Sequence, residues 1–202
     1  MTILLATTSA HKAQEIAELL AETPDLQLET LNDYPATEAP EEDGETMAEN
    51  ARIKAQFYAQ HFGVTVLADD SGIEVDALDG EPGVHSARWA EGSDADRVLA
   101  LLSRLSEVGE QERGARYRCA LCLASPSEIL VETEGTCEGA IAFAPEGQNG
   151  FGYDPVFQIT LATGAANEWV GKTIAQAPPE VKAGVSHRAR AVRELAKKLH
   201  AG

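Results

Sequence analysis

A run of hydroxyl groups followed by a lysine, at residues 7–12, is suited to binding an anion such as phosphate. It lies between an apolar run that is typical of a strand and apolar residues at helical spacing. Backbone N–H groups at the start of a helix attract negative charge, and the ammonium group of Lys12 would strengthen that attraction. No Walker motif is present. Helix capping by Ser9 alone would account for the same residues, so both interpretations stay open.

Asp69 and Asp70 are candidates for acid–base or metal chemistry. They follow the apolar residues 64–68, which are expected to form a buried strand that ends at residues 69–72. Neighbouring side chains of a strand point to opposite faces, so one aspartate can face a cleft while the other faces a supporting partner. A carboxylate in that place can bind magnesium or accept a proton from water. A turn capped by aspartate would use the same residues.

Residues 150–155 form a glycine-rich segment that could recognise a base. Gly152 allows close backbone approach, and the rings of Phe151 and Tyr153 offer flat faces for stacking. Asp154 could accept a hydrogen bond from a ring N–H. A structural turn before the next strand would explain the same residues.

The residues Ser186-His187-Arg188 stand at the predicted start of the last helix, with Lys182 just before. An arginine can donate to a purine carbonyl oxygen or to a phosphate. An arginine in the first turn of a helix opposes the helix dipole, which favours a functional role over a solvated helix start.

The composition excludes several classes of protein. The chain has 202 residues with 33 acidic and 16 basic ones, a net charge of −17, so we expect no binding to nucleic acid. The acidity could also reflect adaptation to high salt. We find no membrane-spanning run and no signal peptide, and therefore expect a cytoplasmic protein with no membrane contact. Cys119 and Cys122 form a C-x-x-C motif, which we interpret as part of a buried strand rather than as a redox pair.

Helical and extended patterns alternate in the first half of the chain, and two long strands follow. One helix is expected to follow Ser9, with further helices at residues 46–62, 94–107 and 186–200, and strands at 2–7, 26–31, 64–68, 115–124 and 129–142. This pattern predicts an α/β protein with a mixed sheet and flanking helices. No linker or repeat divides the chain, so we expect residues 1–202 to form a single domain.

Six motifs in this order make the resemblance to a known family specific. They are T-x-x-x-x-K from Thr7, E-x-G-x-T-x-x-E-N-A-x-x-K-A from Glu42, A-D-D-S-G from Ala68, P-G-x-x-S-A-R from Pro82, G-F-G-Y-D-P from Gly150 and S-H-R from Ser186. The chain thereby resembles the inosine/xanthosine triphosphate pyrophosphatases over nearly its whole length. The resemblance implies an elongated α/β fold with two lobes around a central substrate cleft, and usually a homodimer.

The resemblance also implies a reaction and roles for residues. The reaction is hydrolysis of a purine nucleoside triphosphate such as ITP, dITP or XTP to the monophosphate and pyrophosphate, with Mg2+ as cofactor. Asp70 would be the general base and, with Glu42, a metal ligand. The remaining residues would bind substrate, the phosphates first and the base last: Thr7, Thr8, Ser9, Ala10, His11, Lys12, Lys54, Ser71, Phe151, Gly152, Tyr153, Asp154, Lys182, His187 and Arg188.

The chain departs from the family pattern in its phosphate segment. The usual T-G-N is Thr7-Thr8-Ser9 here, and His11 replaces a common glycine. The usual E-K-N-x-I before S-H-R is Val181-Lys182-Ala183-Gly184-Val185. These changes affect the expected phosphate contacts, while Asp70 and the proposed nucleobase segment at residues 150–155 are retained. A nucleotide-binding sensor without hydrolysis, or a pyrophosphatase for other modified nucleotides, are the competing hypotheses.

Overall fold

The computed structural model describes residues 1–21, 23, 26–162 and 164–201. Its strands are β1 (Thr2–Ala6), β2 (Gln27–Thr30), β3 (Val66–Val75), β4 (Gly114–Ala124), β5 (Ile129–Ile141) and β6 (Phe157–Ile159). Its α-helices are α1 (Ala10–Leu20), α2 (Met47–Phe62), α3 (Asp94–Arg104), α4 (Pro179–Val185) and α5 (His187–Ala201).

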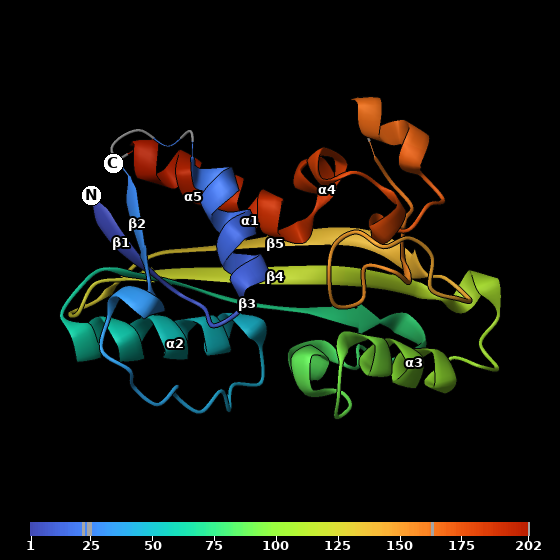
Figure 1. The fold of residues 1–202 in the computed structure, drawn as a ribbon, viewed down its shortest axis with the longest axis horizontal. Helices are drawn as coiled ribbons and strands as arrows, with labels where there is room; N and C mark the ends of the chain where they lie inside the picture. The colour runs from blue at the N-terminus through green and yellow to red at the C-terminus, as the bar shows by residue number, and fades with distance from the viewer. Residues whose placement is uncertain (22, 24–25, 163, 202) are drawn as a thin grey trace. The chain divides into compact units, whose positions relative to one another are not determined.

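The strands form one mixed sheet in the order β2-β1-β3-β4-β5-β6. β1 pairs in parallel with β2 and β3, and β5 pairs antiparallel with β6. Helices flank the sheet (Figure 1), so the predicted α/β class with a mixed sheet is confirmed. The register places Ala6 beside Ala68, and therefore Thr7 and Asp69 follow at the same level of two neighbouring parallel strands.

The Cα positions separate into two compact units. Unit 1 comprises Met1–Ser71, Cys119–Gly135 and His187–Gly202, and unit 2 comprises Gly72–Arg118 and Thr136–Ser186. β3, β4 and β5 each contribute residues to both units. The central substrate cleft between two lobes, which the family resemblance implies, stays a prediction.

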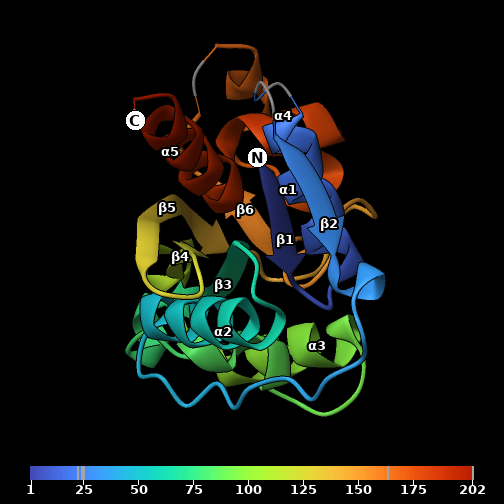
Figure 2. The same ribbon diagram turned by 90° about the vertical axis from the view of Figure 1, so that its left-hand side faces the viewer.

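In unit 1, α1 and α5 lie on one face of β1, β3 and β4, and α2 lies on the other face (Figures 1 and 2). The apolar faces of α1 and α5 meet the strands in one core, whose buried members include Ile3, Leu5, Ile16, Leu20, Leu67, Leu121, Leu123, Val192 and Leu195. Ser9 caps α1, because its hydroxyl accepts the Lys12 N–H. α2 begins with a capping box of Thr46 and Glu49 and ends at Gly63, whose φ of 70° is left-handed.

Unit 2 has a core of its own. Val98, Leu101 and Leu105 of α3 pack with Ile73 and Val75 of β3. The apolar residues of β4, β5 and β6 complete this core, which also holds Tyr153 and Val185. The segment 150–154 is therefore anchored in the core of unit 2 through its tyrosine.

Three local predictions differ from the structure. The strand expected to end at residues 69–72 continues to Val75, so Asp69 and Asp70 lie within β3. Lys12 and Arg188 compensate the burial of Asp69, which allows the strand to continue through the two aspartates. α3 ends at Arg104 rather than at 107, where Leu105 caps it. α4 was not expected, although the paired prolines at its start are typical of a helix N-terminus.

Candidate functional site

Residues 7–12 form the predicted turn from β1 into α1. Thr7 Oγ1 accepts the Ser9 N–H at 3.2 Å, and Ser9 Oγ accepts the Lys12 N–H at 3.4 Å. Thr8, Ala10 and His11 are exposed. These bonds confirm the capping interpretation of Ser9, and they leave the exposed residues of the turn facing solvent.

Asp70 belongs to a group of carboxylates around the ammonium of Lys54. Lys54 Nζ lies 2.8 Å from Glu42 Oε2 and 3.5 Å from Asp70 Oδ1. Asn50 Nδ2 donates to the other oxygen of Asp70 at 3.4 Å, and Asn50 Oδ1 accepts the Gly44 N–H at 2.9 Å. Asn50 and Lys54 stand four residues apart on α2 and therefore share the face that meets Asp70. α2 thus positions the carboxylate of β3.

Asp69 has a separate set of cationic partners. Its Oδ2 lies 3.0 Å from Lys12 Nζ and 3.9 Å from Arg188 Nε. Ser71 Oγ donates to Asp69 at 3.3 Å and accepts from Arg188 Nη2 at 3.0 Å. The other guanidinium nitrogen of Arg188 donates to Glu15 on α1. The expectation that one aspartate faces a supporting partner is confirmed.

The pKa values of the two adjacent aspartates are driven apart. Burial raises the pKa of Asp70, and the attraction of Lys54 and Lys12 does not outweigh it. Burial also acts on Asp69, but Lys12 and Arg188 outweigh it and lower the pKa of that carboxyl to about 2. The pKa of Lys54 is raised because Asp70, Asp69 and Glu42 outweigh the opposing effect of burial. Asp69 is therefore a fixed negative charge, and Asp70 is the carboxyl better suited to exchanging a proton.

The segment 150–154 in unit 2 is organised by Asp154, which is 3% exposed. Asp154 Oδ2 accepts from the Phe151 N–H at 3.0 Å and from Lys182 Nζ at 2.6 Å. Tyr117 donates to Oδ1 at 3.2 Å. Lys182 Nζ lies 4.3 Å from the centroid of the Phe151 ring, within cation–π range. Asp154 thus holds an aromatic ring and an ammonium group together.

Tyr153 is part of the core rather than of an open surface. Its side chain is 5% exposed and its hydroxyl donates to the Ser86 carbonyl at 2.9 Å. Burial raises the pKa of the phenol to about 12, so it stays a donor. Phe151 is only partly buried. Of the two predicted stacking rings, Phe151 is thus the one with an open part of its surface.

The structure brings the predicted residues together in two groups. Unit 1 holds the residues at 7–12, with Glu42, Lys54, Asp70, Ser71, His187 and Arg188. Unit 2 holds Phe151, Gly152, Tyr153, Asp154 and Lys182. Sequence reasoning left Glu15 and Asn50 out of the site. The E-N-A motif was a signal for Asn50, whereas the partner of Arg188 lies 173 residues away and left no local signal.

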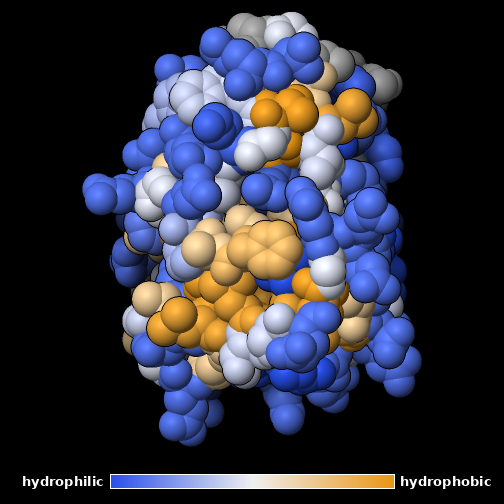
Figure 3. Space-filling model, turned by 90° about the vertical axis from the view of Figure 1, so that its right-hand side faces the viewer, coloured by the Kyte–Doolittle hydropathy of each residue, from blue (hydrophilic) through white to orange (hydrophobic). Residues whose placement is uncertain are grey.

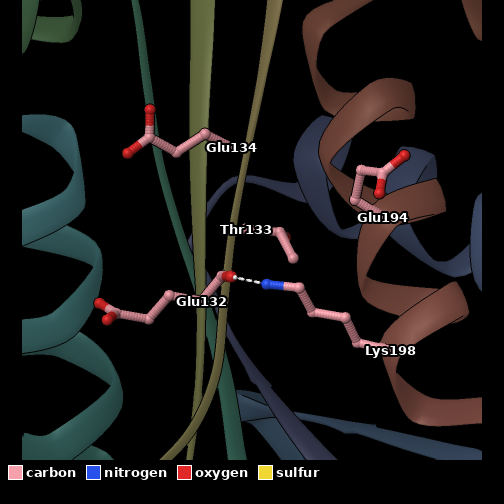
Figure 4. A pocket seen from close by; sticks show the side chains of 5 residues that line it. All are labelled: Glu132, Thr133, Glu134, Glu194 and Lys198. Carbon is pink, nitrogen blue, oxygen red and sulfur yellow. Dashed lines mark hydrogen bonds between the residues drawn. The ribbon is translucent and has the colours of Figure 1, made fainter. Parts of the chain in front are cut away.

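The other candidate features do not coincide with these groups. A cavity of about 250 Å³ between β5 and α5 is lined by Glu132, Thr133, Glu134, Glu194 and Lys198, and contains none of the predicted residues (Figure 4). The three cysteines are buried, and none of them forms a disulfide in the described part of the chain. Burial raises the pKa of Cys119 to about 12 and that of Cys122 to about 11, which disfavours the thiolate that redox chemistry requires.

The sequence matches the model of the Ham1 family over residues 3–198. The chain belongs to the Ham1 family. A dITP/XTP pyrophosphatase of an Exiguobacterium species is 46% identical to it, across 96% of this chain and 95% of the relative. The dITP/XTP pyrophosphatase of Geobacillus kaustophilus is 43% identical, across 96% and 91%. The resemblance inferred from the six motifs is thereby confirmed.

Solved structures agree with this assignment. A HAM1 protein from Coxiella burnetii superposes with a TM-score of 0.87 at 33% identity, covering 100% of both chains. The nucleoside-triphosphatase / dITP/XTP pyrophosphatase of Mycobacterium abscessus has a TM-score of 0.76 at 41% identity, with coverage of 96% and 98%. Within the described part of the chain, no helix is long and apolar enough to cross a membrane.

Proposed function

We propose that this protein hydrolyses non-standard purine nucleoside triphosphates (ITP, dITP and XTP) to the monophosphate and pyrophosphate. The observation that carries the proposal is the pair of adjacent aspartates with opposite pKa shifts, set among Lys12 and Lys54. The names of the relatives supply the substrate class. Removal of these nucleotides would cleanse the cellular nucleotide pool.

The unit 1 group has the charges that a triphosphate needs. Lys12 and Lys54 are two of only six lysines in a chain of net charge −17. Both are held by aspartates, so each ammonium can exchange a carboxylate contact for a phosphate oxygen. The exposed Thr8 and Ala10 of the turn can add backbone N–H groups at the start of α1. The side chain of Thr8, where the family has glycine, would border this path.

Asp70 is the residue we assign as general base. It accepts a proton from a water molecule, the water oxygen forms a bond to phosphorus, and the anhydride bond between the α and β phosphates breaks with pyrophosphate as the leaving group. A carboxylate whose pKa is raised by burial is a stronger base than an ordinary aspartate. Asn50 and Lys54 fix its two oxygens, which limits the directions from which it can take the proton.

The donor set around Lys54 also fits Mg2+. Magnesium prefers oxygen ligands and commonly uses one or two carboxylates together with substrate phosphates and water. Glu42 and Asp70 are two such carboxylates, and both contact the same ammonium group, which a divalent cation could replace. Bound there, magnesium would neutralise phosphate charge and polarise the reacting phosphorus.

The unit 2 group supplies the chemistry for recognising a base. The exposed part of the Phe151 ring can stack on a purine, and Lys182 beside it can donate to the 6-oxo group that distinguishes inosine and xanthosine from adenine. A site built to donate to that oxygen discriminates against the adenine amine. We propose that His187 and Arg188, which belong to unit 1, are substrate-binding residues as well.

Pyrophosphate release from ITP, dITP, XTP, GTP, ATP and CTP, each with Mg2+ or with EDTA, tests the proposal. We expect rapid release from the first three alone, lost in EDTA. Equal release from methylated or pyrimidine nucleotides would favour a pyrophosphatase of other specificity. Tight binding of ITP without release would favour a sensor. The alternative of a sensor has only the altered residues Thr8 and Ser9 in its favour.

We also propose that the protein is a cytoplasmic homodimer. The face drawn in Figure 3 carries a patch of apolar side chains among polar ones, the kind of surface that partners cover. Light scattering coupled to gel filtration would give twice the 21.5 kDa chain mass for a dimer, and the chain mass itself would contradict this part of the proposal.

A further inference from the structure

Asp94, the first residue of α3, contacts the segment 150–154, and both belong to unit 2. Asp94 Oδ2 accepts the backbone N–H of Gly152 at 2.7 Å, across 58 residues of sequence. Its other oxygen is paired with Arg97 Nη2 at 2.5 Å, and Arg97 Nη1 donates to the Gly92 carbonyl at 3.1 Å. Arg97, which lies three residues further along α3, therefore holds the carboxylate of Asp94 in place.

Asp94 is not needed to cap α3. The cap is a box formed by Ser93 and Asp96: the Asp96 carboxylate accepts the Ser93 N–H at 2.7 Å, and Ser93 Oγ accepts the Asp96 N–H at 3.3 Å. These bonds satisfy the Ser93 N–H and one of the N–H groups that a helix start leaves open. The carboxylate of Asp94 is thus available for the segment at residues 150–154.

The bond from Gly152 to Asp94 controls the backbone on one side of Phe151. On the other side, the Phe151 N–H is bonded to Asp154. The peptide planes before and after Phe151 are therefore each held by a carboxylate, which fixes the direction of its side chain beneath Lys182. Gly152 has a φ of 62° and open space where a side chain would lie, so the backbone there is free to move without the bond.

We propose that Asp94 is a positioning residue for the base: it holds the Phe151 ring in the orientation that accepts a purine. This inference rests on the proposed function and goes beyond it, because Asp94 would act on the base only through Gly152 and Phe151. The preference for one purine base over another then depends in part on α3, which carries Asp94. Loss of the bond leaves Phe151 flexible, so purine binding weakens while the phosphate chemistry of unit 1 continues.

The test uses three variants of the full chain. Asp94→Ala removes the acceptor, and we expect KM for ITP to rise about tenfold with kcat changed less than about twofold. The preference for ITP over ATP falls by a similar factor. Asp94→Asn keeps an oxygen that can accept from Gly152, so it restores most of the affinity. Asp96→Ala removes the same charge two residues away from a side chain that accepts from Ser93 and not from Gly152, so its KM stays close to that of wild type.

Hydrogen exchange of the peptide that contains residues 150–154 provides a measurement independent of activity. We expect faster exchange in Asp94→Ala than in Asp96→Ala or wild type. Unchanged exchange, or a loss in kcat with unchanged KM, overturns the positioning role. If the wild-type protein hydrolyses no nucleotide, the proposed function fails on its own. ITP affinity from calorimetry then replaces KM, and equal affinity of Asp94→Ala and wild type overturns this inference.

Discussion

Two adjacent aspartates have opposite pKa shifts because their side chains leave β3 on opposite faces. Asp69 meets Lys12 and Arg188, which keep it ionised, whereas Asp70 meets the amide of Asn50 and one ammonium, and burial dominates its pKa. The same residue type at neighbouring positions thus gives one carboxyl with a lowered pKa and one with a raised pKa. Environment rather than identity decides the role.

Substitution of Asp70 tests the assignment of the base. We expect Asp70→Asn to lower kcat for ITP by on the order of a hundredfold or more, because an amide cannot accept the proton. KM is expected to rise too, because Asp70 is also a proposed magnesium ligand, so kcat at saturating Mg2+ and ITP is the quantity to compare. Asp76→Asn is the control: Asp76 directly follows β3, pairs with Arg116 of β4 and has no proposed role. Full activity in Asp70→Asn would show that another group activates water.

Asp69 is predicted to stabilise the fold in a defined pH range. A pKa lowered from 3.8 to about 2 corresponds to stabilisation on the order of 2 kcal/mol. Because the pKa is lower in the folded state, this contribution is complete above about pH 4 and is lost as the pH falls toward 2. Asp69→Asn should therefore unfold at a lower temperature than wild type near neutral pH.

Thermal unfolding in EDTA, from neutral to acid pH, measures the difference in Tm between wild type and Asp69→Asn without any contribution from metal. We expect the difference in Tm between wild type and Asp69→Asn to become smaller in the acid range. The exposed Asp43→Asn is the control for loss of one charge and should follow the wild type. A gap that is constant across pH would contradict the assigned ionisation of Asp69.

At the scale of elements, the contact between β5 and α5 places His187 and Arg188. Thr133 of β5 donates to the Ala191 carbonyl of α5 at 3.0 Å. Two residues further along the same face of β5, Gly135 leaves room for the helix: an added Cβ would lie 2.1 Å from the His187 carbonyl oxygen and 2.5 Å from the Ala191 nitrogen. Only glycine allows α5 to begin this close to the strand.

Gly135→Ala should therefore displace the start of α5. We expect a loss of about 2 kcal/mol or more in the free energy of unfolding, measured with urea, because backbone atoms cannot yield as a side chain can. The value of kcat/KM for ITP should fall too, since Arg188 moves with the helix. Gly109→Ala is the control, because its methyl group would meet only Glu112 Oε2 at 3.7 Å. Wild-type stability in Gly135→Ala would be inconsistent with this packing.

At the scale of the whole molecule, the net charge of −17 produces self-repulsion that salt can screen. The measurement is thermal unfolding from low salt to molar KCl, with EDTA present. We predict that Tm rises with KCl, and that choline chloride has the same effect if screening alone is responsible. A rise complete near 0.15 M, about the physiological range, indicates an ordinary acidic protein. A rise that continues to molar salt indicates salt adaptation, and a constant Tm contradicts both.

The sequence by itself determined the family, the order of elements and most of their ends. Ser9 and Gly63 mark the start of α1 and the end of α2 because capping depends on residues within one helical turn. The alternation of side chains in a strand already separated Asp69 from Asp70. Such features depend on near neighbours, so their signals are local and can be read along the chain.

Only the tertiary structure decided which groups surround these residues. β3 continues through its two aspartates because Lys12 and Arg188, from two different helices, compensate one of them. Tyr153 is in the core instead of on a stacking surface, and Asp94 reaches Gly152 across 58 residues. Contacts of this kind arise where packed elements meet, and the spacing of residues along the chain does not encode them.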